Sequence, residues 1–228
     1  MKSEVLQMDL LEAIKNRHSV RSYENKPLEP NAKNELTKKI NEYNKESGLH
    51  IQLICDEPKA FDSFMAHYGK FSGVTNYIAM IGKKGKDLDT LCGYYGEKLV
   101  LLAQQLGLNS CWVAMTYKKI PSAFKIENGE KVAIVIALGY GKTQGVAHKS
   151  KDFSSVCNVT EPVPEWFRKG VEAALLAPTA MNQQKFTFSL DNNKVTVKSG
   201  VGFYSKIDLG IVKCHFEIGA GKDNFIWG

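Results

Sequence analysis

The chain has 228 residues, of which 43% are hydrophobic, 24% are charged and 10% are aromatic. This is the composition of a globular protein, and it excludes a disordered or fibrous chain; the length suits one large domain or two small ones. The net charge of +6 is spread over many lysines, which argues against nucleic-acid binding. No apolar run reaches the roughly 18 residues of a membrane span, and the charged N-terminus does not resemble a signal peptide. We therefore expect a cytoplasmic protein with no membrane partner.

The cysteines and histidines show no metal-binding or redox pattern. No Cys-x-x-Cys pair and no His-Glu-x-x-His motif is present. The cysteines are odd in number and lie mostly in apolar stretches, so we expect reduced thiols in the core. The sequence therefore predicts no metal site. The residues concerned are Cys55, Cys92, Cys111, Cys157, Cys214, His18, His50, His67, His148 and His215.

Apolar residues at helical spacing predict the first elements of the chain. The opening helix has one apolar face, formed by Leu6, Leu10, Leu11 and Ile14. A second helix begins at Pro30 and ends at Gly48, and the alternating residues 49–55 follow as a half-buried strand. A second strand is expected at 74–81.

The middle of the chain combines the longest helical pattern with the clearest strand. The helix covers residues 88–106 and ends before Gly107, and a short segment at 110–115 comes next. The strand at 132–138 is almost continuously β-branched, which is typical of a strand covered on both faces. The polar stretch 141–155 then predicts an extended crossover.

The remainder of the chain repeats this pattern in outline. It predicts a helix at 164–176, a strand pair turning at 191–193 and a helix at 207–220. Setting Gly96 against Gly210 also aligns Gly107 with Gly221, although few residues are identical. The register fits either a diverged duplication or a chance likeness of two helices. We expect one domain, 1–228, with a first half at 1–140, a crossover at 141–163 and a second half at 164–228.

Two arginines, a histidine and a serine follow the opening helix within five residues. Arg17, His18, Ser19 and Arg21 supply two cations and directional hydrogen bonds, which together suit a phosphate group. Backbone amides at a helix end would add further donors. The alternative is that the two arginines only solvate the end of the helix.

A second polar element lies at 177–184, between a predicted helix and the strand expected at 185–190. Pro178 ends the helix, and Thr179, Asn182 and two glutamines offer donors and acceptors on a tight loop. Taken alone, the segment is either a ligand-binding loop or a polar turn. The aromatic residues Tyr94, Tyr95, Phe203 and Tyr204 are similarly open to two interpretations, a substrate pocket or core packing.

Taken together, these elements resemble the nitroreductase family of flavin enzymes. The family opens with a helix and an Arg-Arg/His-Ser-x-Arg/Lys-x-Phe/Tyr motif, which residues 17–23 match. Its Ala-Pro-Ser-x-x-Asn-x-Gln-Pro loop is matched at 177–185, with Thr179 for the serine and Lys185 for the last proline. Residues 102–112 and 137–141 also resemble the family core. The resemblance implies an α+β fold, an α/β sandwich with a central mixed or antiparallel sheet flanked by helices.

One departure from the family changes what the resemblance implies. The Ala-Pro-Ser loop normally follows the arginine motif by some twenty to thirty residues and reaches the flavin site of a partner subunit. Here residues 44–49 lack it, and it occurs in the second half instead. The chain is therefore similar to a fused pseudo-dimer of two pseudo-repeated halves with one complete site. A monomer would then suffice, although a homodimer is not excluded.

The resemblance implies FMN as the cofactor, with the phosphate held by Arg17 and Arg21, assisted by Lys149 and Lys151. Pro178 and Thr179 would cover one ring face, Asn182 would hydrogen-bond the pyrimidine edge or the ribityl chain, and residues 112–115 would direct backbone amides to N5 and O4. The full predicted set is Arg17, His18, Ser19, Arg21, Trp112, Val113, Ala114, Met115, Lys149, Lys151, Pro178, Thr179, Ala180, Asn182 and Gln184.

The activity implied is a ping-pong transfer of hydride from NADH or NADPH to FMN and then of electrons to a nitroaromatic, quinone or similar small-molecule acceptor. The flavin supplies the chemistry, so no catalytic side chain is predicted, and none of the usual nucleophile or paired-acid motifs is present. Two alternatives stay open. One is a flavin-binding protein without nicotinamide-dependent turnover, and the other is a binding protein for a different phosphorylated ligand.

Overall fold

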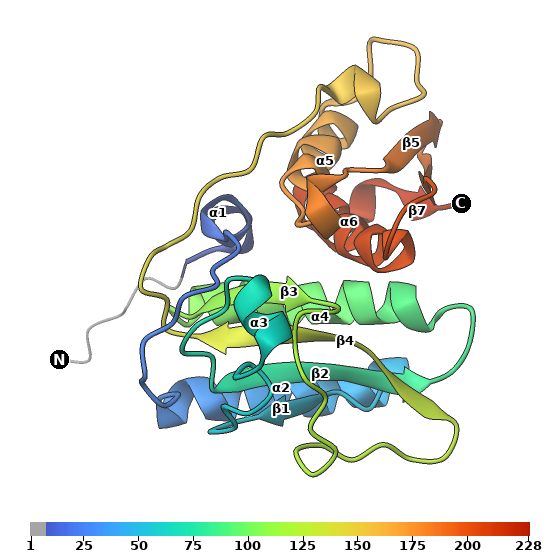
Figure 1. Ribbon diagram of the computed structural model, residues 1–228. Helices are drawn as coiled ribbons and strands as arrows, with labels where there is room; N and C mark the ends of the chain where they lie inside the picture. The colour runs from blue at the N-terminus through green and yellow to red at the C-terminus, as the bar shows by residue number, and fades with distance from the viewer. Residues whose placement is uncertain (1–7) are drawn as a thin grey trace, which may run out of the picture.

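The computed structural model describes residues 8–228 and has an α+β fold with two separate β-sheets (Figure 1). The predicted opening helix is observed as α1 (Leu10–Asn16), whose N-terminus is capped by the Asp9 side chain through the backbone N–H of Glu12. Leu6 lies outside the described residues. No helix in the described part of the chain is long and apolar enough to cross a bilayer.

An antiparallel sheet of order β1-β2-β4-β3 forms the lower layer in Figure 1. The central strands β2 and β4 carry the longest buried runs, which explains their nearly unbroken apolar sequence. α2 and α4 share a core with one face of the sheet, and α3 with neighbouring loops covers the other. The elements of this half are α2 (Pro30–Ser47), β1 (Gln52–Ile54), α3 (Phe64–Tyr68), β2 (Asn76–Lys83), α4 (Leu88–Gln105), β3 (Asn109–Val113) and β4 (Glu130–Gly139).

The second half forms the upper layer, a three-stranded sheet of order β5-β6-β7 with two long helices (Figure 1). β5 and β6 form the predicted hairpin, and β7 joins β6 in parallel. The elements are η1 (Phe153–Ser155), α5 (Glu165–Leu175), η2 (Ala180–Asn182), β5 (Phe186–Asp191), β6 (Lys194–Ser199), α6 (Ser205–Ala220), η3 (Lys222–Asn224) and β7 (Ile226–Trp227). The prediction of one central sheet is corrected to two sheets, because α4 and α6 pack between them.

The crossing of α4 and α6 depends on two glycines that face one another. A Cβ on Gly93 would lie 2.0 Å from the carbonyl oxygen of Ile207, and a Cβ on Gly210 would lie 2.1 Å from that of Thr90. The contacts are reciprocal, since each glycine meets the residue three positions before the other. Only glycine allows the helix backbones to approach this closely.

Most predicted elements appear with ends shifted by a few residues. The 141–155 crossover is largely without regular structure and carries only η1, and it runs as an extended segment up the side of the molecule (Figure 1). The helix at 30–48 ends as predicted at Gly48, which has a left-handed φ of 70°. The five-residue α3 and the two-residue β7 are not predicted, because neither is long enough to show a periodic pattern.

Candidate functional site

A cavity of about 360 Å³ lies where the two halves of the chain meet. This falls within the range of about 300–1,000 Å³ found for small-molecule sites, and its walls are mainly apolar. The first half contributes Ser19, Arg21, Cys111, Trp112, Ala114, Met115, Thr116 and Ile134; the second contributes Pro178, Thr179, Ala180, Met181, Phe203, Tyr204, Ile207, Asp208 and Ile211. The cavity therefore joins the two motifs that lie 160 residues apart in the sequence.

The arginine motif reaches the cavity as an extended segment beside β3. Ser19 pairs with Ser110 in a parallel bridge, and the N–H of Val20 donates to the Ser110 carbonyl at 3.0 Å. Extended backbone turns successive side chains to opposite sides. Val20 is accordingly buried, whereas Ser19 and Arg21 are exposed and line the cavity. The Arg21 guanidinium also lies 5.9 Å from the centre of the Phe71 ring.

Arg17 lies behind this segment and is only 3% exposed. Its Nε is 3.8 Å from Oε1 of the buried Glu97. Within residues 8–228, this Nε is the one buried side-chain nitrogen or oxygen that has no hydrogen-bond partner. Burial lowers the pKa of Arg17, and the Glu97 carboxylate opposes that shift. Arg17 therefore sits beside the cavity wall with an unused donor.

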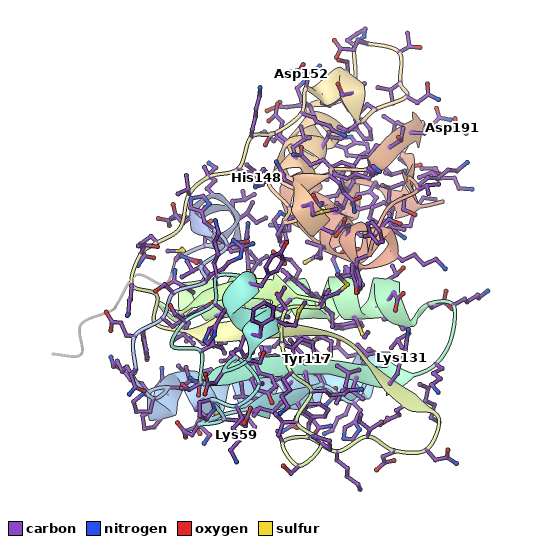
Figure 2. The ribbon with its side chains drawn as sticks, viewed as in Figure 1. Lys59, Tyr117, Lys131, His148, Asp152 and Asp191 are labelled. Carbon is purple, nitrogen blue, oxygen red and sulfur yellow. The ribbon has the colours of Figure 1, made fainter. Side chains whose placement is uncertain are left out.

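His18 lies next to the crossover rather than in the cavity wall. Desolvation lowers its pKa, and the nearby Arg17 and His148 lower it further. Figure 2 shows His148 on the crossover on the side of α5, where its Nε2 lies 2.9 Å from the Leu175 carbonyl oxygen. The lowered pKa of His18 disfavours a positive charge on its ring, so Arg17 is the cation of this group.

Lys149 and Lys151 lie against the 177–184 loop through their backbones. The Asn182 and Gln184 side-chain amides each donate to the Lys149 carbonyl at 2.9 Å, and the Lys151 N–H donates to Gln184 Oε1 at 2.8 Å. The Lys151 ammonium donates to the Gln184 carbonyl at 3.0 Å. These bonds hold the crossover and the loop together, and none of the four residues belongs to the cavity lining.

Asp208 fixes the loop that forms the opposite wall. Its carboxylate accepts from the Ala180 N–H at 3.0 Å and from the Gln183 side chain at 2.7 Å. The Gln183 amide also donates to the Phe203 carbonyl at 2.8 Å. Pro178, Thr179 and Ala180 are thereby held in the cavity wall by the first turn of α6.

Burial raises the pKa of Asp208 to about 6, against the hydrogen bonds from Gln183 and Ala180. The ordinary value is 3.8, so between about pH 4 and pH 6 the native state keeps a proton that the unfolded chain has released. The free energy of unfolding should therefore fall as the pH rises through this window. Asp208→Asn should lack this part of the decrease, which urea denaturation of both proteins at pH 4, 5, 6 and 7 would measure. A wild-type-minus-variant difference that is constant over these pH values would contradict the assignment.

Residues 112–115 follow the end of β3 along the cavity. Trp112, Ala114 and Met115 line it, whereas Val113 is buried on the other face of the sheet. The Trp112 Nε1–H donates to Glu97 Oε2 at 3.0 Å. Ala114 and Met115 lie beyond Val113, which is the last residue of β3 that pairs with β4. Their backbone groups therefore take no part in the pairing of these two strands.

The structure thus brings eight predicted residues into the lining of one cavity: Ser19, Arg21, Trp112, Ala114, Met115, Pro178, Thr179 and Ala180. It places Arg17, His18, Val113, Lys149, Lys151, Asn182 and Gln184 around that wall. Phe203 and Tyr204 line the cavity, whereas Tyr94 and Tyr95 pack around Lys98.

Three buried polar residues near the cavity, Asp208, Glu97 and His215, are absent from the predicted set. Each of them is a polar residue on an otherwise apolar face of α4 or α6, and this is the sequence signal by which it could be found.

The family model and several of the solved structures that match this chain are described as nitroreductases. A family model described as "Putative TM nitroreductase" matches residues 9–220. A structure described as a "putative nitroreductase" from Thermotoga maritima is 25% identical, with a TM-score of 0.69, over 95% of this chain and 86% of that one. No curated protein matches the chain.

Two further structures show the fold alone, because their identity is low. A "Putative NADH dehydrogenase/NAD(P)H nitroreductase" from Bacteroides thetaiotaomicron is 19% identical, with a TM-score of 0.51, over 64% of this chain and 95% of that one. A "putative nitroreductase in complex with fmn" from Desulfovibrio desulfuricans is 18% identical, with a TM-score of 0.53, over 68% of this chain and 98% of that one.

Proposed function

The chain belongs to the nitroreductase family whose model matches residues 9–220, and from this premise we propose that it is an FMN-dependent NAD(P)H oxidoreductase. The observation that carries the proposal is the shared cavity, in which Ser19 and Arg21 of the first half face the Pro178–Ala180 wall of the second. The relative from Desulfovibrio desulfuricans, of similar fold, is described as an FMN complex.

The residues present suit both ends of FMN, its phosphate and its isoalloxazine ring. The phosphate requires cations and directional donors: Arg21 and Ser19 line the cavity, and Arg17, whose Nε has no hydrogen-bond partner, lies two residues before Ser19. The isoalloxazine ring requires a largely apolar slot, and Trp112, Ala114 and Pro178 provide facing apolar walls. Lys149 and Lys151 add two further cations on the crossover.

We assign Asn182 and Gln184 a positioning role: they hold the crossover against the loop that lines the cofactor site. Gln184 is buried, and its side chain bonds Lys149, Lys151 and Asn182. These contacts fix the crossover against the loop, so the basic residues and the Pro178 wall keep one geometry. Asp208 acts on the same loop from α6.

The proposal includes one cofactor site per chain, assembled by a fused pseudo-dimer. The order α5-β5-β6-α6-β7 of the second half parallels α2-β1-β2-α4-β3 of the first, where α3 between β1 and β2 and β4 after β3 have no counterpart. β7 pairs with β6 in parallel. In the first half, β2 and β3 also run parallel to each other, because each is antiparallel to β4, which lies between them. The reciprocal Gly93 and Gly210 contacts at the crossing of α4 and α6 also resemble a two-fold interface. These contacts favour an alignment of the two halves in which Gly93 corresponds to Gly210. This alignment differs by three residues from the one predicted from the sequence, in which Gly96 corresponds to Gly210.

When bound, FMN supplies the redox chemistry that oxidises NADH or NADPH and reduces a nitroaromatic, quinone or similar acceptor. Arg17, Ser19 and Arg21 would hold its phosphate, and the apolar walls of the cavity would exclude water from its ring. Ala114 and Met115 line the same cavity, and their backbone amides would supply dipoles that stabilise negative charge on the ring. No side-chain nucleophile is required, and one small-molecule acceptor can use the same cavity after the nicotinamide leaves.

Anaerobic mixing of the FMN-loaded protein with NADH or NADPH tests this function. We expect the flavin absorbance near 450 nm to bleach with one of the two donors and to return when a quinone is added, because the open cavity admits both substrates in turn. Protein that binds FMN but is not bleached by either donor would instead be a flavin-binding protein without nicotinamide-dependent turnover. Protein that takes up no FMN would contradict the proposal as a whole.

A further inference from the structure

Four side chains form a buried polar cluster directly behind the cavity. Glu97 of α4 and His215 of α6 are both 0% exposed, and Glu97 Oε1 lies 2.8 Å from His215 Nε2. Glu97 Oε2 accepts from the Trp112 indole at 3.0 Å, and Arg17 Nε lies 3.8 Å from Oε1. Trp112 itself lines the cavity, so the cluster touches the cavity wall.

The hydrogen bonds of His215 fix the number of protons in the cluster. Its Nδ1 lies 3.0 Å from the Ala173 carbonyl oxygen, which can only accept, so Nδ1 carries a hydrogen. The 2.8 Å contact between Nε2 and Glu97 then needs a second proton, since two lone pairs would otherwise face each other. His215 and Glu97 therefore share one proton, and together they are neutral whichever atom holds it.

The cluster consequently carries one buried positive charge, that of Arg17, because arginine keeps its proton in proteins. The neighbouring thiols do not offset it, since burial raises the pKa of both Cys111 and Cys214. A buried charge with an unused Nε–H is costly unless an anion balances it. Arg17 lies two residues before Ser19, which lines the cavity.

We infer that the proton shared by Glu97 and His215 keeps Arg17 free of neutralisation, so that its charge selects a phosphate-bearing ligand. A lone Glu97 carboxylate would pair with Arg17 and leave the cluster neutral. With His215 to balance Glu97, the arginine charge remains for the phosphate, and Glu97 also holds Trp112 in the wall. The inference rests on the proposed FMN function and assigns Glu97 and His215 a charge-balancing and positioning role.

A charge cycle of four proteins tests the inference, with riboflavin as the matched ligand that lacks the phosphate. His215→Gln leaves Arg17 and an ionised Glu97, so the net charge falls to zero. Glu97→Gln leaves a neutral His215, which can accept from the new amide, so the net charge stays at +1. The double variant also keeps +1. We expect the FMN dissociation constant to rise about tenfold or more for His215→Gln only, because the ionised Glu97 would then cancel the Arg17 charge that attracts the phosphate.

The double variant should recover FMN affinity to within about threefold of wild type, since its net charge is again +1. Riboflavin affinity should be alike in all four proteins. An equal loss of FMN affinity in His215→Gln and the double variant, or a parallel loss of riboflavin affinity, would overturn the inference and leave His215 with a packing role. Wild-type protein that binds neither flavin would instead contradict the proposed function itself.

Circular dichroism of each apo variant shows whether it has folded. Should His215→Gln not fold, NMR of 15N-histidine-labelled wild-type protein decides the question. The fully buried ring should have one solvent-protected proton at Nδ1 and a second at the Nε2–Glu97 contact. A ring with a proton at Nδ1 and none between Nε2 and Glu97 would overturn the inference.

Discussion

Replacing Arg17 with alanine is expected to weaken FMN binding by about a hundredfold, because it removes a charge-assisted contact from the phosphate end of the site. It should not destabilise the apo protein as the breaking of a buried ion pair would, because Glu97 keeps the proton that it shares with His215, and the buried charge of Arg17 has no anion to balance it. FMN titration of the apo protein and urea denaturation measure the two effects.

Arg168→Ala is the matched control for this prediction. Arg168 is an arginine of the second half whose side chain is 39% exposed, and it pairs with the exposed Glu161 at 2.9 Å. Its loss should cost under about 1 kcal/mol and leave FMN affinity unchanged, because exposed ion pairs contribute little. Equal FMN dissociation constants for the two variants would remove Arg17 from the proposed phosphate site.

Gly93→Ala is expected to destabilise the fold by about 2–3 kcal/mol, against the usual helix preference for alanine over glycine. The new Cβ would lie 2.0 Å from the Ile207 carbonyl oxygen, so α4 and α6 would have to separate. Ile207 and Asp208 of α6 line the cavity, so the same change should weaken FMN binding. Thermal and urea unfolding, together with FMN titration, give the result.

Gly85→Ala provides the comparison for Gly93. Gly85 lies in the turn before α4, where the nearest atom to an added Cβ is the Lys83 carbonyl oxygen at 4.0 Å. We expect its stability to stay within about 0.5 kcal/mol of wild type, as for most surface substitutions. If Gly93→Ala were equally neutral, the close helix crossing would not exist in solution.

Local patterns predicted the elements that are long or chemically marked. Val132 to Leu138 is identifiable as a central strand because both of its faces are buried and its sequence shows it. Pro30 and Gly48 mark the ends of α2 through backbone restrictions that act within the residue itself. The meeting of Ser19 with Pro178 was predicted only through resemblance, because no local signal brings segments of different halves together.

Long-range partners account for what the sequence did not reveal. Glu97 and His215 lie 118 residues apart and bond through the crossing of α4 and α6. Asp208 fixes a loop 28 residues earlier, and nothing around it in the sequence names its partner. The separation into two sheets likewise follows from α4 packing on α6, a contact made by glycines that offer no apolar pattern.

The central claim is that both halves of one chain enclose a single FMN. Titration of the apo protein with FMN, read by flavin absorbance and combined with light scattering for the mass of the particle, tests it most directly. The account predicts saturation at one FMN per chain in a particle as small as the monomer, whose mass is 25.4 kDa. Binding that occurs only in a dimer, or that saturates at a ratio other than one per chain, would contradict it.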